Sequence, residues 1–383
     1  MKLFYIANSR IPSEKANSIQ IVKMAESFTR LLGEDFTLVL PKRIQPAILN
    51  SISIKDYYSL DRNLPIKTIG LPIDPLVLDN YFGLFLNGLP YRVQVILFGI
   101  AVLIFSFRNR YGSIFYTRDF YTLLFIKLAG AKVYYEAHYF PKVTAIKWLH
   151  RIVLPRIEGV VAITGCFKDF FKKNNIHFRK IMTAHDATDP SFFKRYSKAE
   201  LKKKRREVTS TSETIIGYIG NLNGLGEDKG GSDLVKAFDI VRRKYKQVKL
   251  VVVGAGNIAE HKDIYTTGRI RYSEMPLWHN LIDIAVIPFP NRTHFKFFMS
   301  PLKLFDYLAC GKPIVTSDFT SLREVINESN AVFVTASNAK SLAGGIERLL
   351  INKKLQLELS HNNKILANKY TWTKRARAIL NYL

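Results

Sequence analysis

Cysteine is scarce in this chain. Cys166 and Cys310 are the only two among 383 residues, and they lie in separate predicted elements without metal-ligand spacing. This usage fits a reducing compartment better than a disulfide framework, and it argues against a zinc site. The chain begins with a strand-length apolar run that is too short for a secretory signal. The sequence therefore predicts a cytoplasmic protein without a zinc site.

Acidic residues are also few. The chain has 31 Asp and Glu against 57 Lys and Arg, a formal net charge of +26. Such an excess implies an anionic partner or surface, which could be nucleic acid, anionic lipid or a phosphorylated substrate. The sequence has no Cys/His finger and no aromatic RNP-like strand, so we expect no nucleic-acid partner. The most basic run, residues 194–206, is interpreted chiefly as a linker, with membrane contact as the lesser alternative.

No unbroken apolar run in the sequence reaches the ~20 residues that a bilayer span takes. Residues 93–107 come nearest, and Gln94 and Gly99 interrupt them. This length favours a helix buried against a sheet. An element that dips into the membrane surface is the alternative, because residues 73–91 just before it are rich in aromatics and leucine. A peripheral contact with the inner face of an anionic membrane therefore stays open.

The chain is rich in apolar residues, and its predicted strands and helices alternate. Hydrophobic residues make up 48% of it, enough for packed cores. Strands and helices are expected to alternate, which is typical of the α/β class with parallel sheets. The expected strands are residues 4–7, 36–40, 113–117, 132–136, 159–164, 181–183, 214–219, 248–253, 284–287 and 314–316. The expected helices are residues 18–32, 93–107, 120–129, 232–244, 275–281 and 300–311.

The length of the chain suits two domains of ~150 to 200 residues each. The alternation restarts after the basic run, and we place the domain boundary there. The predicted parts are a first domain of residues 1–195, a basic linker of residues 196–212 and a second domain of residues 213–366. A final helix over residues 367–383 could cross back to the first domain.

The helix expected over residues 300–311 has an unusual polar face. Ser300 is a good N-cap, and Gly311 should end the helix. Ser300, Lys303 and Asp306 then share one face at a spacing of three. A lysine in the first turn opposes the helix dipole, so it makes better sense beside a bound anion such as phosphate. Asp306 could accept hydrogen bonds from a ribose diol, although a solvated amphipathic helix explains the pattern equally well.

Two further features suggest ligand contacts. Lys229 lies in a loop after a predicted strand, among glycines that let the backbone approach an anion. The GxxxxGK[ST] pattern is absent, and a flexible connection is the competing interpretation. His138 follows the carboxyl end of a predicted parallel strand, where such folds place ligand groups, although a lone histidine is more often a structural hydrogen-bonding residue.

In their order, these motifs resemble the family 4 glycosyltransferases. The resemblance rests on the strand ending at Gly220 followed by Lys229-Gly230, on residues 273–288, on SPLKLFDYLACGKPIVTSD from Ser300, and on Tyr370-Thr371-Trp372. It spans nearly the whole chain and is most specific in the second half. It implies the GT-B fold, with two Rossmann-like, doubly wound domains facing a cleft. It also implies a retaining transfer from a nucleotide-diphosphate sugar to a polysaccharide or lipid-linked acceptor.

The resemblance assigns roles to particular residues. Lys229 would hold the diphosphate, Asp306 would bind the ribose, and His138 would reach the transferred sugar or its phosphate. The remaining donor-site positions are Gly220, Asn221, Gly230, Gly268, Arg269, Ser300, Leu302 and Lys303. Lysine and a helix terminus could stabilise the leaving diphosphate, so no metal and no other cofactor is expected.

This chain departs from the family pattern in two places. Phe298 stands where the pattern has a glutamate, and Asn221 stands where an arginine usually follows the glycine. These changes indicate either a distinct subfamily or a weakened catalyst. Two alternatives to transfer therefore stay open: a nucleotide-sugar epimerase of the same fold, and a non-catalytic scaffold that binds nucleotide sugars.

Overall fold

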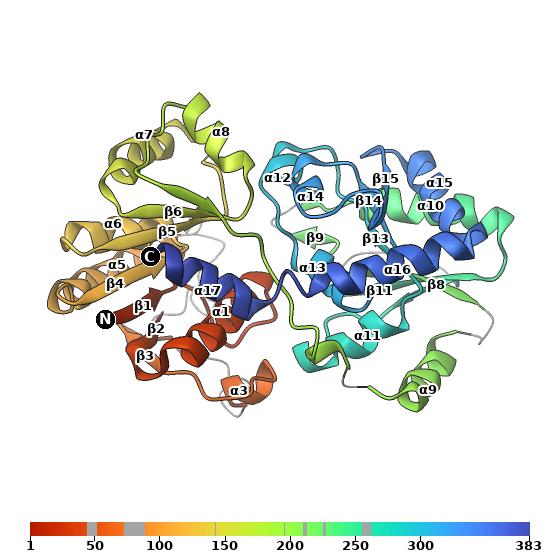
Figure 1. Ribbon diagram of the computed structural model, residues 1–383, viewed down its shortest axis with the longest axis horizontal. Helices are drawn as coiled ribbons and strands as arrows, with labels where there is room; N and C mark the ends of the chain where they lie inside the picture. The colour runs from red at the N-terminus through yellow and green to blue at the C-terminus, as the bar shows by residue number, and fades with distance from the viewer. Residues whose placement is uncertain are drawn as a thin grey trace. The chain divides into compact units, whose positions relative to one another are not determined.

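The computed structural model describes residues 1–43, 52–72, 89–141, 143–194, 196–209, 213–224, 227–254 and 262–383. It divides into two compact units (Figure 1). The first consists of Met1–Ala184 together with Arg375–Leu383, and the second of His185–Lys374. The end of the chain therefore belongs to the first unit. The sequence predicted a first domain of residues 1–195, a linker of residues 196–212 and a second domain from residue 213, whereas the contacts divide the chain between residues 184 and 185.

The first unit contains a seven-stranded sheet whose neighbouring strands all pair in parallel. Its order is β3-β2-β1-β4-β5-β6-β7. The strands are β1 (Lys2–Ile6), β2 (Phe36–Pro41), β3 (Ile66–Ile69), β4 (Ser113–Thr117), β5 (Val133–Ala137), β6 (Gly159–Ala162) and β7 (Ile181–Thr183). All were expected from the sequence except β3, which has no fully buried residue and hence little apolar signal.

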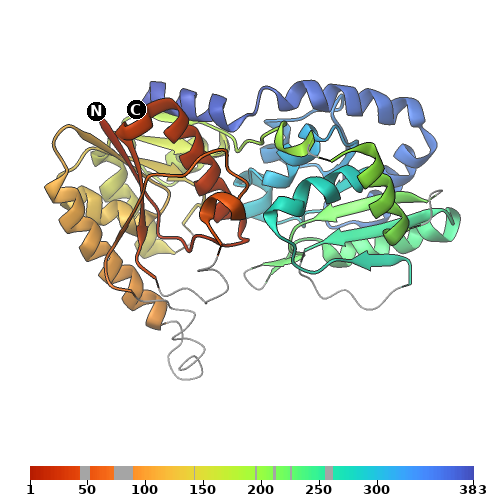
Figure 2. The ribbon, with the colours of Figure 1, turned by 90° about the horizontal axis from the view of Figure 1, so that it is seen from below.

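Helices cover both faces of this sheet, with α1 and α17 on one side and α5 and α6 on the other (Figure 2). The helices are α1 (Ala16–Leu32), α3 (Ile54–Tyr57), α5 (Leu89–Arg108), α6 (Phe120–Leu128), α7 (Thr144–Val153), α8 (Cys166–Lys173) and α17 (Trp372–Tyr382). Helix α5 contains the apolar run at residues 93–107. That run was expected to be buried, but one face of it is exposed. The neighbouring residues 73–88 lie outside the described part of the chain.

The second unit contains a six-stranded parallel sheet in the order β12-β11-β8-β13-β14-β15. Its strands are β8 (Thr214–Ile219), β11 (Val248–Val253), β12 (Ile264–Thr266), β13 (Ile284–Ile287), β14 (Ile314–Ser317) and β15 (Ala331–Val334). A short ribbon of β9 (Asn223–Gly224) and β10 (Glu227–Asp228) follows β8.

Apolar layers form on both faces of the second sheet, because alternate residues of β8 point to opposite sides. Ile215 and Ile219 join the cluster that includes helix α13, and Ile216 and Tyr218 join the cluster beneath α10 and α15. The helices of this unit are α9 (Lys198–Val208), α10 (Gly231–Lys244), α11 (Met275–Leu281), α12 (Thr293–Phe297), α13 (Leu302–Ala309), α14 (Thr320–Arg323), α15 (Ala339–Ile351) and α16 (Lys353–Ala367).

Part of the expected basic linker is helical. Ser197 and Glu200 form a capping box at the start of α9, and that pattern could have been recognised in the sequence. Helix α9 contacts α11 within the second unit. Its basic residues therefore belong largely to a folded helix.

Both sheets have the doubly wound order, in which the first strand lies between the second and the fourth. The chain reverses direction across the sheet between β1 and β4, and again between β8 and β13. Ligands of open α/β sheets bind outside the carboxyl ends of the strands at this switch point. The predicted α/β class with two Rossmann-like units is therefore confirmed.

Candidate functional site

Close backbone contacts define the switch point of the second unit. Gly230 has a φ of 95°, and a Cβ built on it would lie 1.7 Å from the carbonyl oxygen of Pro288, which follows β13. A Cβ on Gly254, which follows β11, would lie 2.5 Å from the carbonyl oxygen of Gly220, which follows β8. Only glycine fits at these two positions. The glycines thus hold three strand ends together at one edge.

The first amides of α10 are already occupied. Asp228 Oδ1 accepts hydrogen bonds from the amides of Gly230 and Gly231, at 2.9 and 2.6 Å. The other carboxylate oxygen accepts from the hydroxyl of Ser232. Gly230 was expected to offer its amide to an anion. Instead it allows close packing, and Asp228 caps the helix.

Positive charge gathers at the same edge. Nζ of Lys303 lies 3.6 Å from the ring centroid of Tyr218, and a Cβ on Gly220 would be 3.0 Å from it. Burial, and then the charge of Lys229, lower the pKa of Lys303 well below its usual value. Burial also lowers the pKa of Lys229. No carboxylate among the described residues forms an ion pair with either lysine, so this pair of cations is uncompensated.

The N-terminus of α13 adds further donors. The helix begins at Leu302, with Pro301 as N-cap and no side-chain cap. Within the described chain, the amides of Leu302 and Lys303 have no hydrogen-bond acceptor. Two free amides, a helix dipole and two nearby lysines can together bind an anion such as a diphosphate.

The expected N-cap, Ser300, does not cap α13. Its Oγ instead accepts a hydrogen bond from the amide of Asp186 at 2.8 Å. Ser300 is buried, so its hydroxyl needs this long-range partner. The expectation of an N-cap here was wrong, because the chain before the helix is held by a segment far away in sequence.

Asp306 lies one turn after Lys303 on the same helix. Its Oδ1 accepts a hydrogen bond from Thr188 Oγ1 at 2.9 Å, and the side chain is 21% exposed. His279 Nε2 lies 3.9 Å from Oδ2, and burial lowers the pKa of His279 to about 3, so this histidine is neutral. The carboxylate is therefore fixed by Thr188 and remains partly accessible.

The turn at Gly268 and Arg269 lies beside the same edge. Gly268 pairs with Gly254 in an isolated antiparallel bridge, and Gly254 in turn packs on Gly220. The side chain of Asn221 is exposed, and its carbonyl accepts from the hydroxyl of Tyr218 at 3.1 Å. The structure therefore brings Gly220, Gly268 and Lys303 to neighbouring places. Phe298, which replaces the expected glutamate, is only 2% exposed.

His138 belongs to the first unit and follows β5. Its Nε2 lies 2.6 Å from Glu136 Oε1, and its side chain is 15% exposed. Burial, and then Arg118, lower the pKa of His138 to about 4 against the pull of Glu136. The ring is therefore neutral at physiological pH. With the proton on Nε2 donated to Glu136, Nδ1 is left as an acceptor.

Glu136 is the centre of this network. It is fully buried and also accepts from Gln20 Nε2 at 2.7 Å, from Arg375 Nη2 at 2.8 Å and from the hydroxyl of Tyr116. Burial alone would raise the pKa of Glu136, but Arg375 and His138 hold it well below its usual value. An ionised carboxylate is thus fixed behind His138.

Sequence reasoning missed several residues of both sites. Glu136 carried a usable signal, because an acid inside an apolar strand is costly unless it is paired. Asp228 before a Gly-Gly-Ser helix start also fits a capping pattern. Tyr218, Thr188 and Arg375 gave no signal, since each acts through a partner distant in sequence.

Comparisons with known proteins agree with this geometry. Residues 213–352 match the family model described as Glycosyl transferases group 1. The capsular polysaccharide biosynthesis glycosyltransferase CapM of Staphylococcus aureus is 23% identical over 236 residues, covering 58% of this chain and 55% of CapM. A phosphatidyl-myo-inositol mannosyltransferase of Propionibacterium freudenreichii is 24% identical over 163 residues, covering 42% of this chain and 40% of that protein. The chain thus spans only about half the length of these relatives.

Solved structures share the fold over the whole chain. HepE of Anabaena in complex with UDP and glucose has a TM-score of 0.73 at 13% identity, covering 100% of this chain and 98% of that one. Sucrose-phosphate synthase of Thermosynechococcus elongatus has a TM-score of 0.74 at 14% identity, with the same coverage. The chain therefore has the GT-B fold. Within it, residues 213–352 of the second unit are similar to the group 1 glycosyl transferases.

Proposed function

We propose that this protein is a glycosyltransferase that moves a sugar from a nucleotide-diphosphate sugar to an acceptor. The observation that carries the proposal is the uncompensated pair Lys229 and Lys303 beside the free amides of α13. This anion site lies at the switch point of the unit that matches the group 1 glycosyl transferases. Several similar structures contain UDP or UDP-glucose, which supports a nucleotide donor.

The chemistry of the donor site follows from these charges. Cleavage of the anomeric bond leaves negative charge on the nucleoside diphosphate, and preorganised cations and amides stabilise it. Each such donor is worth on the order of 3 kcal/mol by analogy with oxyanion holes. Asp306 is placed to accept hydrogen bonds from the ribose, and Gly268 and Arg269 are assigned to the base. We propose that this set works without a metal, so chelation with EDTA should leave transfer unchanged.

The family, the stereochemistry and the acceptor are proposed from the resemblance to the family 4 glycosyltransferases and from the names of the relatives. We propose a family 4 enzyme that transfers a hexose with retention, with neutral His138 contacting the transferred sugar through Nδ1. The acceptor is proposed to be a polysaccharide or lipid-linked glycan, because the curated relatives act in capsule synthesis and on phosphatidyl-myo-inositol. A cytoplasmic location with peripheral membrane contact fits such an acceptor and the net charge of +26.

A non-catalytic scaffold is the second candidate. The buried Phe298 gives the donor site no carboxylate where the family pattern has one, and Asn221 gives it no guanidinium. A protein altered in this way could bind nucleotide sugars without turning them over.

Transfer assays with a panel of labelled nucleotide sugars and lipid-linked or polysaccharide acceptors test the proposal. We expect transfer that depends on an acceptor, that is lost in Lys229→Met, and whose product keeps the anomeric configuration of the donor by NMR. Saturable donor binding without transfer would favour the scaffold. Release of an epimer without any acceptor would favour an epimerase instead.

A further inference from the structure

One face of helix α5 is apolar and exposed along its length. Its exposed residues recur at steps of three or four and so share one face of the helix. They are Val93, Ile96, Ile100, Ile104 and Phe107, each between 41% and 57% exposed, and we call them the α5 stripe. A surface helix of a soluble protein usually turns charged or polar residues to this side.

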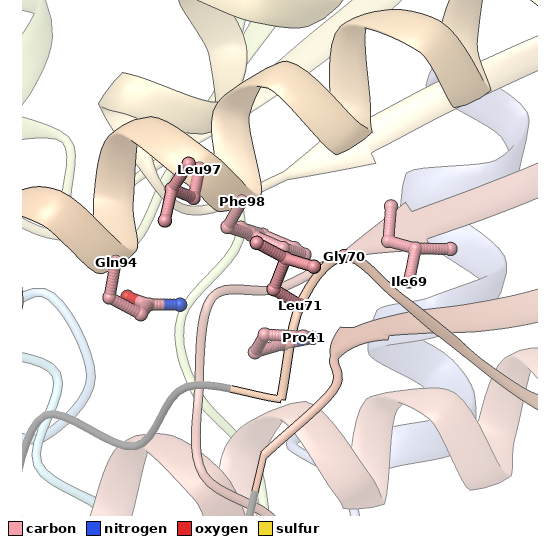
Figure 3. Close-up of a pocket in the computed structure, with 7 residues that line it drawn as sticks. All are labelled: Pro41, Ile69, Gly70, Leu71, Gln94, Leu97 and Phe98. Atoms are coloured by element: carbon pink, nitrogen blue, oxygen red, sulfur yellow. The ribbon is translucent and has the colours of Figure 1, made fainter.

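The opposite face of α5 fixes the helix in the first unit. Phe98, Val102 and Phe105 are buried, and Gly99 lies against the ring of Phe125 in α6. Midway along the helix, Phe98 helps to line a pocket at the ends of β2 and β3 (Figure 3). Within residues Pro90–Arg108, which are long and apolar enough to cross a membrane, 39% are buried in the unit. The helix is therefore packed along one side and exposes the α5 stripe along the other.

The charged residues of α5 itself are all basic. No Asp or Glu occurs anywhere from residue 80 to residue 118. Arg92 and Arg108 are exposed near the two ends of the helix. The guanidinium of Arg110 lies 3.8 Å from the ring centroid of Phe107. In the described chain, none of these three arginines forms an ion pair.

We propose that the α5 stripe docks this protein on an anionic lipid bilayer, with the helix lying parallel to the membrane plane. Interfacial helices bury an apolar face at the boundary between headgroups and acyl chains, and basic residues beside that face bind anionic headgroups. An anionic bilayer is a better partner for this surface than a second copy of this chain. In a dimer formed through the α5 stripe, the arginines of the two copies would lie close together and repel each other. The proposal is independent of the donor site.

Co-sedimentation with vesicles tests this surface. One vesicle type contains phosphatidylcholine with phosphatidylglycerol, and the other contains phosphatidylcholine alone. The stripe variant is Ile96→Glu/Ile104→Glu. The matched control, Leu357→Glu/Ile365→Glu, changes two residues of α16 that are at least as exposed as Ile96 and Ile104. We expect the wild type and the control to bind the anionic vesicles, and the stripe variant to lose at least about tenfold in partitioning.

The arginines have their own test. Arg92→Ala/Arg108→Ala should weaken binding and flatten its dependence on salt, whereas Lys353→Ala/Lys354→Ala on α16 should change neither. Thermal unfolding and donor binding, measured on every variant, separate a failure of docking from a failure of folding or of the donor site. The proposal is overturned if the wild type ignores anionic vesicles or the stripe variant binds as well as the control. It is also overturned if sedimentation velocity shows a dimer that the stripe variant separates.

Discussion

The ammonium group of Lys303 lies over the ring of Tyr218, with Nζ 3.6 Å from the ring centroid. This cation–π contact offsets part of the cost of burying the charge. Burial and Lys229 nevertheless hold the pKa of Lys303 well below its usual value. The charged form of Lys303 is thus disfavoured in the ligand-free protein, and a bound anion would stabilise it.

Replacing this lysine should stabilise the ligand-free protein. The pKa of Lys303 is lower in the folded protein than in the unfolded chain. At a pH between these two pKa values, the unfolded chain therefore binds more protons than the folded protein. The free energy of unfolding should rise with pH over this range. Lys303→Met keeps the apolar stem and removes the charge. We expect the variant to be more stable than the wild type near neutral pH, because it no longer buries an amine whose charged form is disfavoured. Urea unfolding near pH 7 and near pH 10 measures both the gain and the flatter pH dependence.

The control for this prediction is Lys340→Met, which removes an exposed lysine of the same unit. It should leave stability and its pH dependence nearly unchanged. If Lys303→Met is destabilised as much as a core variant, the lysine is structural and its charge is not held for a ligand.

The contact between Gly230 and Pro288 predicts a large difference between two glycine substitutions. Gly230 has a φ of 95°, and the Cβ of Gly230→Ala would collide with the carbonyl oxygen of Pro288. This variant should lose more than about 2 kcal/mol in the free energy of unfolding. Gly344→Ala, inside α15 with nothing within 4 Å, should gain roughly 0.5 to 1 kcal/mol. Chemical denaturation of both variants measures the difference. Equal effects would mean that the loop after β10 does not pack on Pro288.

The ion pair between Arg375 and Glu136 predicts a remote effect on His138. Arg375→Met leaves a buried carboxylate without its cation and should cost about 3 to 5 kcal/mol. It should also raise the pKa of His138 from about 4, because Arg375 is one of the charges that lower it. NMR titration of the His138 ring measures this shift. Arg377→Met, an exposed neighbour on α17, should alter neither quantity.

A double variant tests whether the loss of stability in Arg375→Met comes from the unpaired charge of Glu136. Adding Glu136→Gln to Arg375→Met removes the unpaired charge and should recover part of the lost stability. Failure to recover would show that Arg375 acts through packing alone.

The local pattern of the sequence was enough to predict much of the fold. Strand β11 and helix α11 have the expected bounds, because apolar runs and turn residues mark their ends. The polar face of α13 likewise follows from the spacing of Lys303 and Asp306. The end of that helix at Gly311, with a φ of 61°, is equally local.

Features that depend on distant partners could not be predicted in this way. Glu136 and Arg375 are separated by 239 residues, and Ser300 and Asp186 by 114. The exposure of the α5 stripe depends on which side of the helix meets α6 and the sheet. An apolar run that shows no polar side gives no sign of that choice.

Lys229, Lys303 and Asp306 are proposed to bind the diphosphate and ribose of a nucleotide sugar. A thermal-shift screen of the whole protein against UDP, GDP, ADP and their sugar conjugates tests this proposal most directly, with Lys229→Met and Asp306→Ala beside the wild type. One nucleotide series should stabilise the wild type, by roughly 2.7 kcal/mol at 100-fold saturation, and neither variant should respond. The proposal is contradicted if no nucleotide stabilises the wild type at millimolar concentration, or if both variants respond as strongly as the wild type.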